Sequence, residues 1–223
     1  MIRLISFEGG DGSGKTTQLT LLENYLTGQG RLSLSTREPG ATNLGETIRK
    51  MLLQSGKGKI SSTAELFLYL SDRAQHVQEV IQPAIDDGII VLCDRFIDST
   101  LAYQGFGRGL DLGTVRTLNK VASHGIEPDL TFLLDCPVEI GLSRAKERLG
   151  APRSSAAGAR GEKRQGQDRF EQETEDFHER VRRGFLELAW AEPKRVYILD
   201  ASRSISKIQE EIRSIVEQRL IGN

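Results

Sequence analysis

The stretch FEGGDGSGKTT, residues 7–17, contains the pattern GxxxxGK[ST] from Gly9 to Thr16. A short apolar run, 3–7, precedes the pattern, and a segment with helical periodicity follows it. Glycines let the backbone curl so that its N–H groups point inward and cradle phosphates. Lys15 adds a positive charge for the β- and γ-phosphates, and the Thr16 hydroxyl is a Mg²⁺ ligand in such loops. The stretch therefore predicts a phosphate-binding loop (P-loop) between a strand and a helix.

Four further β-rich runs follow the loop and alternate with segments of helical period. They cover residues 32–36, 89–93, 130–135 and 195–199. Apolar strands that are separated by helices predict a parallel sheet covered on both faces. We therefore expect one α/β domain over residues 1–223, with a five-stranded parallel sheet. Ligands of such folds bind at the carboxyl ends of the strands.

Composition excludes several classes of partner. The 223 residues include 30 Lys and Arg against 31 Asp and Glu, so no overall charge favours nucleic acid. No apolar stretch approaches the ~18 residues that span a bilayer, and the first residues lack a signal-peptide pattern. Cys93 and Cys136 each end an apolar run, which indicates buried strand ends rather than a disulfide framework. A cytoplasmic enzyme without nucleic-acid or membrane partners is expected. The three histidines, His76, His124 and His178, are expected to be surface or capping residues.

A P-loop alone does not separate kinases from switches. A GTP switch needs an NKxD motif at a strand end, and the nearest match, the tetrapeptide NKVA that starts at Asn119, lacks the Asp. This match also falls in a segment of helical period. The pattern argues against a GTP switch and leaves kinases and other nucleotide-hydrolysing proteins open.

Charged residues follow two of the expected strands. Asp94 and Arg95 come directly after the run 89–93, where a carboxylate is placed to hold Mg²⁺ or its water, or to orient a phosphate acceptor. The planar fork of Arg95 suits a bridge between two phosphates. Arg37, in the turn REPG, follows the run 32–36. These residues are expected beside the P-loop, at the same edge of the sheet.

The segment that starts at Ser62 predicts an amphipathic helix. Ser62 and Glu65 have the spacing of a capping box, and an apolar stripe runs from Leu66 to residue 81. Arg73 falls inside this stripe, with Tyr69 on its flank one turn earlier. A buried charge is costly unless it is paired or reaches a ligand. Two interpretations stay open here: a guanidinium and an aromatic ring that bind a nucleobase, or an arginine that is paired with a buried carboxylate or extends to solvent.

Several blocks together resemble the thymidylate kinase family, in its bacterial branch. They are FEGGDGSGKTTQ, TREPG, SDRAQH, DRFIDSTLAYQGFGRG, PDLTFLLDCPVEIGL and DRFE, in the order and spacing of that family. The resemblance covers nearly the whole chain, and the DRF…AYQG block is far more specific than a P-loop. It implies transfer of the γ-phosphoryl group of ATP to dTMP, with Mg²⁺ as cofactor and a homodimer formed through the helix that starts at Ser62.

The resemblance also implies roles for individual residues. Arg37 and Arg95 would bind the acceptor phosphate, Arg73 the thymine, and Tyr69 would stack on the base where relatives carry Phe. Tyr103 would lie against the sugar C2′ atom and disfavour a hydroxyl there. The other implied contacts are Asp11 with the sugar 3′-OH, Arg144 near the donor adenine, and Ser99, Thr100 and Gln104 beside the base and the phosphate. The ATP side comprises Gly9, Gly10, Asp11, Gly12, Ser13, Gly14, Lys15 and Thr16, with Thr16 and Asp94 as candidate metal ligands.

The segment 150–167 departs from the family pattern, because it is longer than the usual bacterial flap. It reads GAPRSSAAGARGEKRQGQ, and it is either a mobile active-site flap (a LID, about 150–168) or a solvated insertion. Position 12 is Gly, so the P-loop itself carries no arginine beside Lys15. We expect an arginine of the segment to act in catalysis, with Arg153 and Arg160 as favoured candidates.

Two alternatives to a dTMP kinase remain at this point. A deoxynucleoside kinase shares the P-loop and the acid–arginine pair, but it has no need for a phosphate-binding arginine such as Arg37. A P-loop ATPase or switch would bind the nucleotide without a phosphate acceptor.

Overall fold

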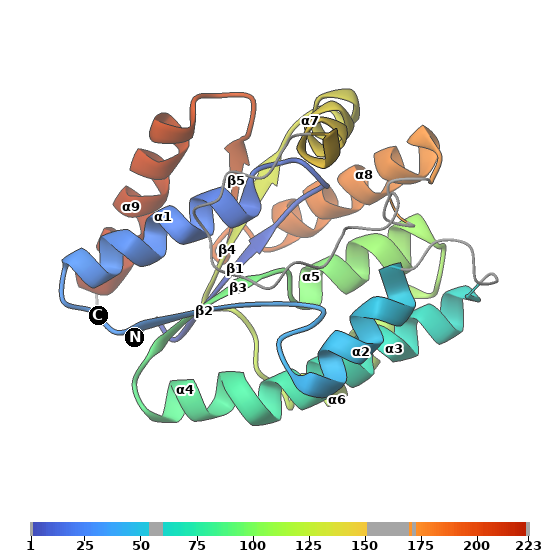
Figure 1. Cartoon of the computed structure of the whole chain (residues 1–223), viewed down its shortest axis with the longest axis horizontal. Helices are drawn as coiled ribbons and strands as arrows, with labels where there is room; N and C mark the ends of the chain where they lie inside the picture. Colours follow the sequence, from blue (N-terminus) through green and yellow to red (C-terminus); the bar gives the residue numbers. More distant parts are fainter. Residues whose placement is uncertain (1, 54–59, 151–169, 171–172, 222–223) are drawn as a thin grey trace.

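The computed structural model describes residues 2–53, 60–150, 170 and 173–221, and it contains a five-stranded parallel sheet (Figure 1). The strands are β1 (Leu4–Glu8), β2 (Ser33–Arg37), β3 (Ile90–Asp94), β4 (Leu130–Asp135) and β5 (Val196–Asp200), in the order β2-β3-β1-β4-β5. Each predicted run coincides with a strand, and four of the five strands begin and end one residue later than predicted. The predicted fold class is confirmed.

Helices connect the strands. They are α1 (Lys15–Gly28), α2 (Asn43–Leu53), α3 (Ser62–His76), α4 (Gln82–Asp86), α5 (Ile97–Thr100), α6 (Leu112–Ala122), α7 (Val138–Gly150), α8 (Glu175–Ala191) and α9 (Ile205–Ile221). Two π-helical segments, η1 (Val77–Ile81) and η2 (Leu101–Gly107), extend α3 and α5. The NKVA tetrapeptide lies entirely within α6, as expected, and not at a strand end.

Helices cover both faces of the sheet because its strand residues are apolar on both sides. Ile5, Phe7 and Phe132 pack with α1 and α9 on one face. Leu4 and Val91 pack with η1 and α4 on the opposite face, where α8 covers β4. Figure 1 shows the same division, with α1 and α9 on one side of the strands and α4, α5 and α8 on the other. Both cysteines are buried and free.

The start of α3 differs from the expected capping box. The N-cap is Ser61, whose hydroxyl accepts from the backbone N–H of Ala64 at 3.3 Å. Ser62 is already the first helical residue, and Glu65 is fully buried away from the cap. The prediction was wrong by one residue because two serines in succession both suit a cap. The apolar stripe of this helix is buried as predicted.

Acidic and basic side chains gather at the carboxyl edge of the sheet. Register places Asp94 beside both Phe7 and Arg37, at the ends of the three neighbouring strands β3, β1 and β2. Glu8 ends β1, and the P-loop follows it directly. No helix in the described part of the chain is long and apolar enough to cross a membrane.

Candidate functional site

The P-loop, residues 9–14, passes close to two neighbouring backbone segments. Gly9 (φ +135°) and Gly12 (φ +74°) have backbone angles that favour glycine. A Cβ atom on Gly9 would lie 2.4 Å from the carbonyl oxygen of Leu134, and one on Gly12 would lie 2.0 Å from that of Gly141. Only glycine fits at either position. Close packing against α7 therefore also explains why position 12 carries no arginine.

Lys15 begins α1 and folds back over the loop. Its Nζ atom donates to the carbonyl oxygens of Gly9 (3.0 Å) and Gly10 (2.8 Å). Burial lowers the pKa of Lys15 to about 8, and Arg95 acts in the same direction. The ammonium group thus lies within the loop, a position suited to the negative charge of phosphates.

Thr16 and Asp94 meet as predicted. The Thr16 hydroxyl donates to Asp94 Oδ2 at 2.6 Å, which joins the start of α1 to the end of β3. Both residues offer hard oxygen donors of the kind Mg²⁺ prefers, and Mg²⁺ in nucleotide sites keeps few protein ligands. Among the described residues no group of three His, Cys, Asp or Glu could hold a metal by itself. The pair fits an ion that takes most of its ligands from phosphates and water.

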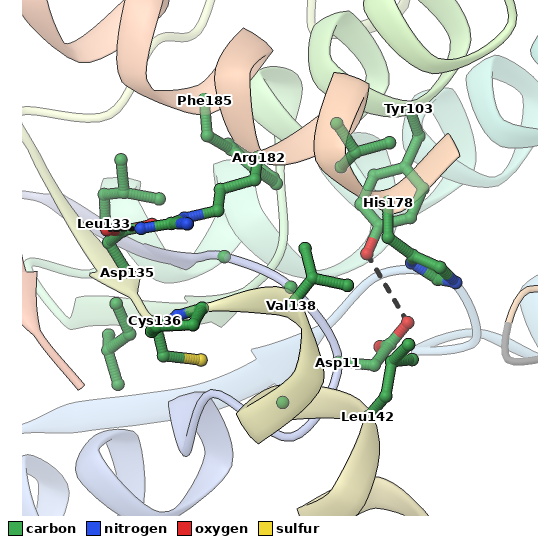
Figure 2. A pocket seen from close by; sticks show the side chains of 16 residues that line it. Asp11, Tyr103, Leu133, Asp135, Cys136, Val138, Leu142, His178, Arg182 and Phe185 are labelled. Atoms are coloured by element: carbon green, nitrogen blue, oxygen red, sulfur yellow. Dashed lines mark hydrogen bonds and ion pairs between the residues drawn. The ribbon is translucent and has the colours of Figure 1, made fainter. Parts of the chain in front are cut away.

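Arg95 connects the end of β3 with the P-loop. Its backbone is left-handed (φ 70°), and this turns the side chain toward the loop. Its Nη1 donates to the Gly9 carbonyl oxygen at 3.1 Å, and its Nη2 donates to Asp11 Oδ1 at 2.6 Å. The Tyr103 hydroxyl donates to Asp11 Oδ2 at 3.5 Å (Figure 2). The structure therefore brings together three of the residues for which the family resemblance implies a place beside the acceptor: Asp11, Arg95 and Tyr103.

Glu8 holds the turn that contains Arg95, and sequence reasoning missed it. This fully buried carboxyl group accepts from the backbone N–H of Phe96 (2.7 Å) and from the Ser99 hydroxyl (2.5 Å). Burial, together with the nearby Asp98, raises the pKa of Glu8 to about 8. The available signal was an acidic residue at the end of an otherwise apolar strand.

Arg73 is buried and is surrounded by acceptors. Its Nε donates to Glu38 Oε2 at 2.9 Å, and its Nη1 donates to the side chains of Thr100 (2.9 Å) and Asn119 (2.5 Å). Its Nη2 donates to the Phe96 carbonyl oxygen at 3.0 Å and lies 2.7 Å from Glu38. Of the two interpretations left open by the sequence, pairing with a buried carboxylate is the one observed. A hydrogen bond from Arg73 to a base would have to replace or share one of these contacts.

Replacing Arg73 by Ala should lower the free energy of unfolding by about 3–5 kcal/mol, because it leaves the buried carboxylate of Glu38 without its arginine. The family resemblance implies a place for Arg73 beside the base, so in folded protein the acceptor KM should also rise about tenfold, with the KM for ATP unchanged. Chemical denaturation and steady-state kinetics measure the two effects. Arg116→Ala, on the exposed face of α6, is the matched control and should change neither. A decrease of less than about 1 kcal/mol in the free energy of unfolding would show that the contacts of Arg73 with Glu38 and its other buried partners do not stabilise the fold.

The remaining acceptor candidates lie around the same edge. Arg37 is exposed at the end of β2, in register with Asp94. Tyr69 is half-buried, with its ring centroid 6.3 Å from that of Phe170. Ser99, Thr100 and Gln104 are all buried, and the hydroxyl of Ser99 accepts from Arg95 Nη1 at 3.3 Å.

Arg144 lies on the other side of the P-loop. Its Nη1 donates to the carbonyl oxygen of Ala201 at 2.9 Å and so joins α7 to the segment after β5. Between α7, α8 and the loop there is a small hollow that is partly open to solvent. Figure 2 shows Asp11 and Tyr103 at one end of this hollow and the ion pair of Asp135 with Arg182 at the other. Both nitrogen–oxygen contacts of that pair are short, at 2.8 and 3.0 Å.

The expectation that the three histidines are surface or capping residues was wrong for two of them. His76 is fully buried and contacts Glu38 (3.0 Å) and Thr36 (2.7 Å). His178 is also buried and borders the hollow, and burial lowers its pKa. His124 is exposed, as expected. The error arose because α3 and α8 are covered on more than one face, which a single apolar stripe does not reveal. The candidates Arg153 and Arg160 lie outside the described residues.

Comparison with known proteins points to one family. The family model described as "Thymidylate kinase" matches residues 7–212. The thymidylate kinase of Desulfovibrio desulfuricans is 50% identical over 216 residues, which cover 97% of this chain and 95% of that protein. The thymidylate kinase of Geotalea daltonii is 48% identical and covers 98% of each chain. The crystal structure of thymidylate kinase from Ehrlichia chaffeensis superposes with a TM-score of 0.73 at 31% identity, over 96% of this chain and 98% of that one.

Proposed function

Because this chain belongs to the thymidylate kinase family and is an ATP:dTMP phosphotransferase, we propose a division of work among its residues. The reaction transfers the γ-phosphoryl group of ATP to dTMP and gives dTDP and ADP. The P-loop and Lys15 bind the donor phosphates, and the residues around Arg95 bind the acceptor.

On the donor side, the loop 9–14 and Lys15 fix the β- and γ-phosphates of ATP, and Arg144 borders the adenine. The hydrogen bonds from Lys15 to the carbonyl oxygens of Gly9 and Gly10 support this assignment. Thr16 and Asp94 would hold Mg²⁺, which neutralises charge on the phosphates when it is bound. Their mutual contact at 2.6 Å supports a shared ion at this point.

On the acceptor side, Arg37 and Arg95 bind the phosphate of dTMP, and Asp11 accepts from the sugar 3′-OH. Arg73, Tyr69, Ser99, Thr100 and Gln104 surround the base and its phosphate. Phosphoryl transfer needs alignment and charge neutralisation more than proton transfer, so these residues act mainly by positioning.

The contact of Arg95 with both Gly9 and Asp11 is the observation that carries this proposal most directly. One guanidinium that touches the P-loop from the acceptor side is placed to bridge the two phosphates as the phosphoryl group moves. An assay of ADP release with each common nucleoside and nucleoside monophosphate tests it. ADP release that depends on dTMP is expected. Dependence on thymidine would indicate a nucleoside kinase, and release without any acceptor would indicate an ATPase.

Selectivity for a deoxyribose is assigned to Tyr103. Its ring packs against Phe177 and Phe185, at centroid distances of 6.2 and 6.1 Å. Tyr103→Phe keeps this packing, so the ratio of kcat/KM for deoxy over ribo acceptors should stay within about twofold. Tyr103→Ala opens space at C2′ and should lower the ratio about tenfold or more, the usual order for a steric contact. An unchanged ratio in the Ala variant would place the selectivity elsewhere.

Three further expectations belong to this proposal. The chain is proposed to be cytoplasmic, which its two free cysteines support. It is proposed to form a homodimer through α3, which the exposed Phe67 side chain on that helix supports. Residues 150–168 are proposed to act as a LID that supplies a catalytic arginine, Arg153 or Arg160.

A further inference from the structure

Glu65 is a fully buried carboxylate that lies behind one of the proposed base-binding residues. It is on the buried side of α3, and its Oε1 accepts from Gln104 Nε2, in η2, at 2.9 Å. The same oxygen accepts from Arg108 Nε at 3.1 Å, and its Oε2 accepts from Arg108 Nη2 at 3.1 Å. A buried carboxylate with such bonds is costly to disturb, so its geometry is firmly held.

The carboxylate determines which way the Gln104 amide faces. An amide has a donor end and an acceptor end, and the hydrogen-bond network decides between the two orientations. Both oxygens of Glu65 accept from Arg108. A carboxylate in such a pair has no proton to donate, so it can only accept a hydrogen bond from Gln104. The NH₂ group of Gln104 must therefore face Glu65, and its carbonyl oxygen faces away. In the described part of the chain no donor bonds this oxygen.

Arg108 holds the carboxylate in place from the other side. Its guanidinium lies 4.5 Å from the ring centroid of Phe177 and 5.5 Å from that of Phe170, and it pairs with Glu173 at 2.7 Å. Rings and a second carboxylate thus restrict the guanidinium from several directions. The orientation of Gln104 is fixed before any substrate binds.

We propose that Glu65 is a positioning residue for base selection, acting by locking Gln104 as a hydrogen-bond acceptor toward the base. This inference rests on the proposed function, which puts Gln104 beside the base. An acceptor suits thymine, whose N3 carries a hydrogen. It opposes cytosine, whose N3 carries a lone pair instead. A site built this way rejects the wrong base because two acceptors face each other without a proton.

Glu65→Gln is the direct test, because a neutral amide at this position can donate to Gln104 as well as accept from it. Gln104 is then free to reverse. The ratio of kcat/KM for dTMP over dCMP should fall about tenfold or more, with both a loss for dTMP and a gain for dCMP. The ratio of Kd values gives the same comparison where turnover of dCMP is too slow to measure.

Glu173→Gln is the matched control. This change removes the second carboxylate that pairs with Arg108 and leaves the hydrogen bond between Glu65 and Gln104. The ratio of kcat/KM for dTMP over dCMP should therefore stay within about twofold of wild type. An equal loss in this control would overturn the proposal, since a general disturbance around Arg108 would then explain both variants.

Glu65→Asp carries the test if Glu65→Gln does not fold. The shorter side chain keeps a charge for Arg108 but withdraws from Gln104, so the ratio should again fall. In the background of Gln104→Met, replacing Glu65 should change the ratio no further. A wild-type ratio in the folded Glu65 variants would overturn the inference. A wild-type ratio in Gln104→Met alone would instead show that the proposed placement of Gln104 is wrong.

Discussion

Replacing Lys15 by Ala is expected to lower kcat by about a hundredfold to a thousandfold or more, with the fold intact. Lys15 supplies the positive charge inside the P-loop, and loss of one positioned charge or donor at a developing negative charge has effects of this order. The reaction has little other chemistry that could compensate, because positioning and charge neutralisation provide most of the rate.

The control for this variant is Lys120→Ala, at an exposed position of α6, which should keep turnover within about twofold. Circular dichroism and thermal unfolding verify that both variants are folded. A folded Lys15→Ala protein that keeps more than about a tenth of wild-type turnover would show that the loop does not bind the transferred phosphoryl group.

Arg95→Lys should lose about a hundredfold in kcat/KM for the acceptor. Lysine keeps the charge, but it cannot reproduce a planar fork that contacts Gly9 and Asp11 through two nitrogens. The loss should fall on kcat as well as on the acceptor KM, because a bridge between donor and acceptor matters most during transfer. The KM for ATP should change little.

Arg116→Lys, on the exposed face of α6, provides the matched arginine control and should behave as wild type. If Arg95→Lys raised only the KM for ATP, Arg95 would belong to the donor side, and the proposed arrangement of the two substrates would be incorrect.

The fold, and the gathering of several site candidates at one edge of the sheet, could be predicted because both are encoded in short local patterns. Alternating apolar runs gave all five strands, and the GxxxxGK[ST] pattern gave the loop. The carboxyl-edge rule for parallel sheets correctly predicted that Asp94 and Arg95 would lie beside the P-loop, although both are far from the loop in sequence.

The buried acidic residues could not be predicted in the same way. Glu8 holds the turn that contains Arg95, Glu38 holds Arg73, and Glu65 holds the amide of Gln104. These contacts join residues that lie between 35 and 91 positions apart in the chain. Local periodicity carries no information about such pairs. The burial of His76 and His178 was missed for a related reason, since it depends on which neighbouring elements cover a helix.

Arg73 illustrates the limit of pattern reasoning. Its place in an apolar stripe indicated a paired or ligand-bound charge, and this was correct, but the stripe could not identify the partner. The structure identifies it as Glu38, with Thr100 and Asn119 as additional acceptors. The roles of Arg153 and Arg160 remain predictions from the sequence.

All the proposed residue roles depend on the claim that the γ-phosphoryl group of ATP passes directly to dTMP. To test this claim, ATP labelled in its γ-phosphate is incubated with the enzyme, Mg²⁺ and dTMP, and the products are separated by chromatography. Label is expected in dTDP, in amounts equal to the ADP formed, and thymidine in place of dTMP should accept none. Label that appears in free phosphate, or in dTMP formed from thymidine, would contradict the claim.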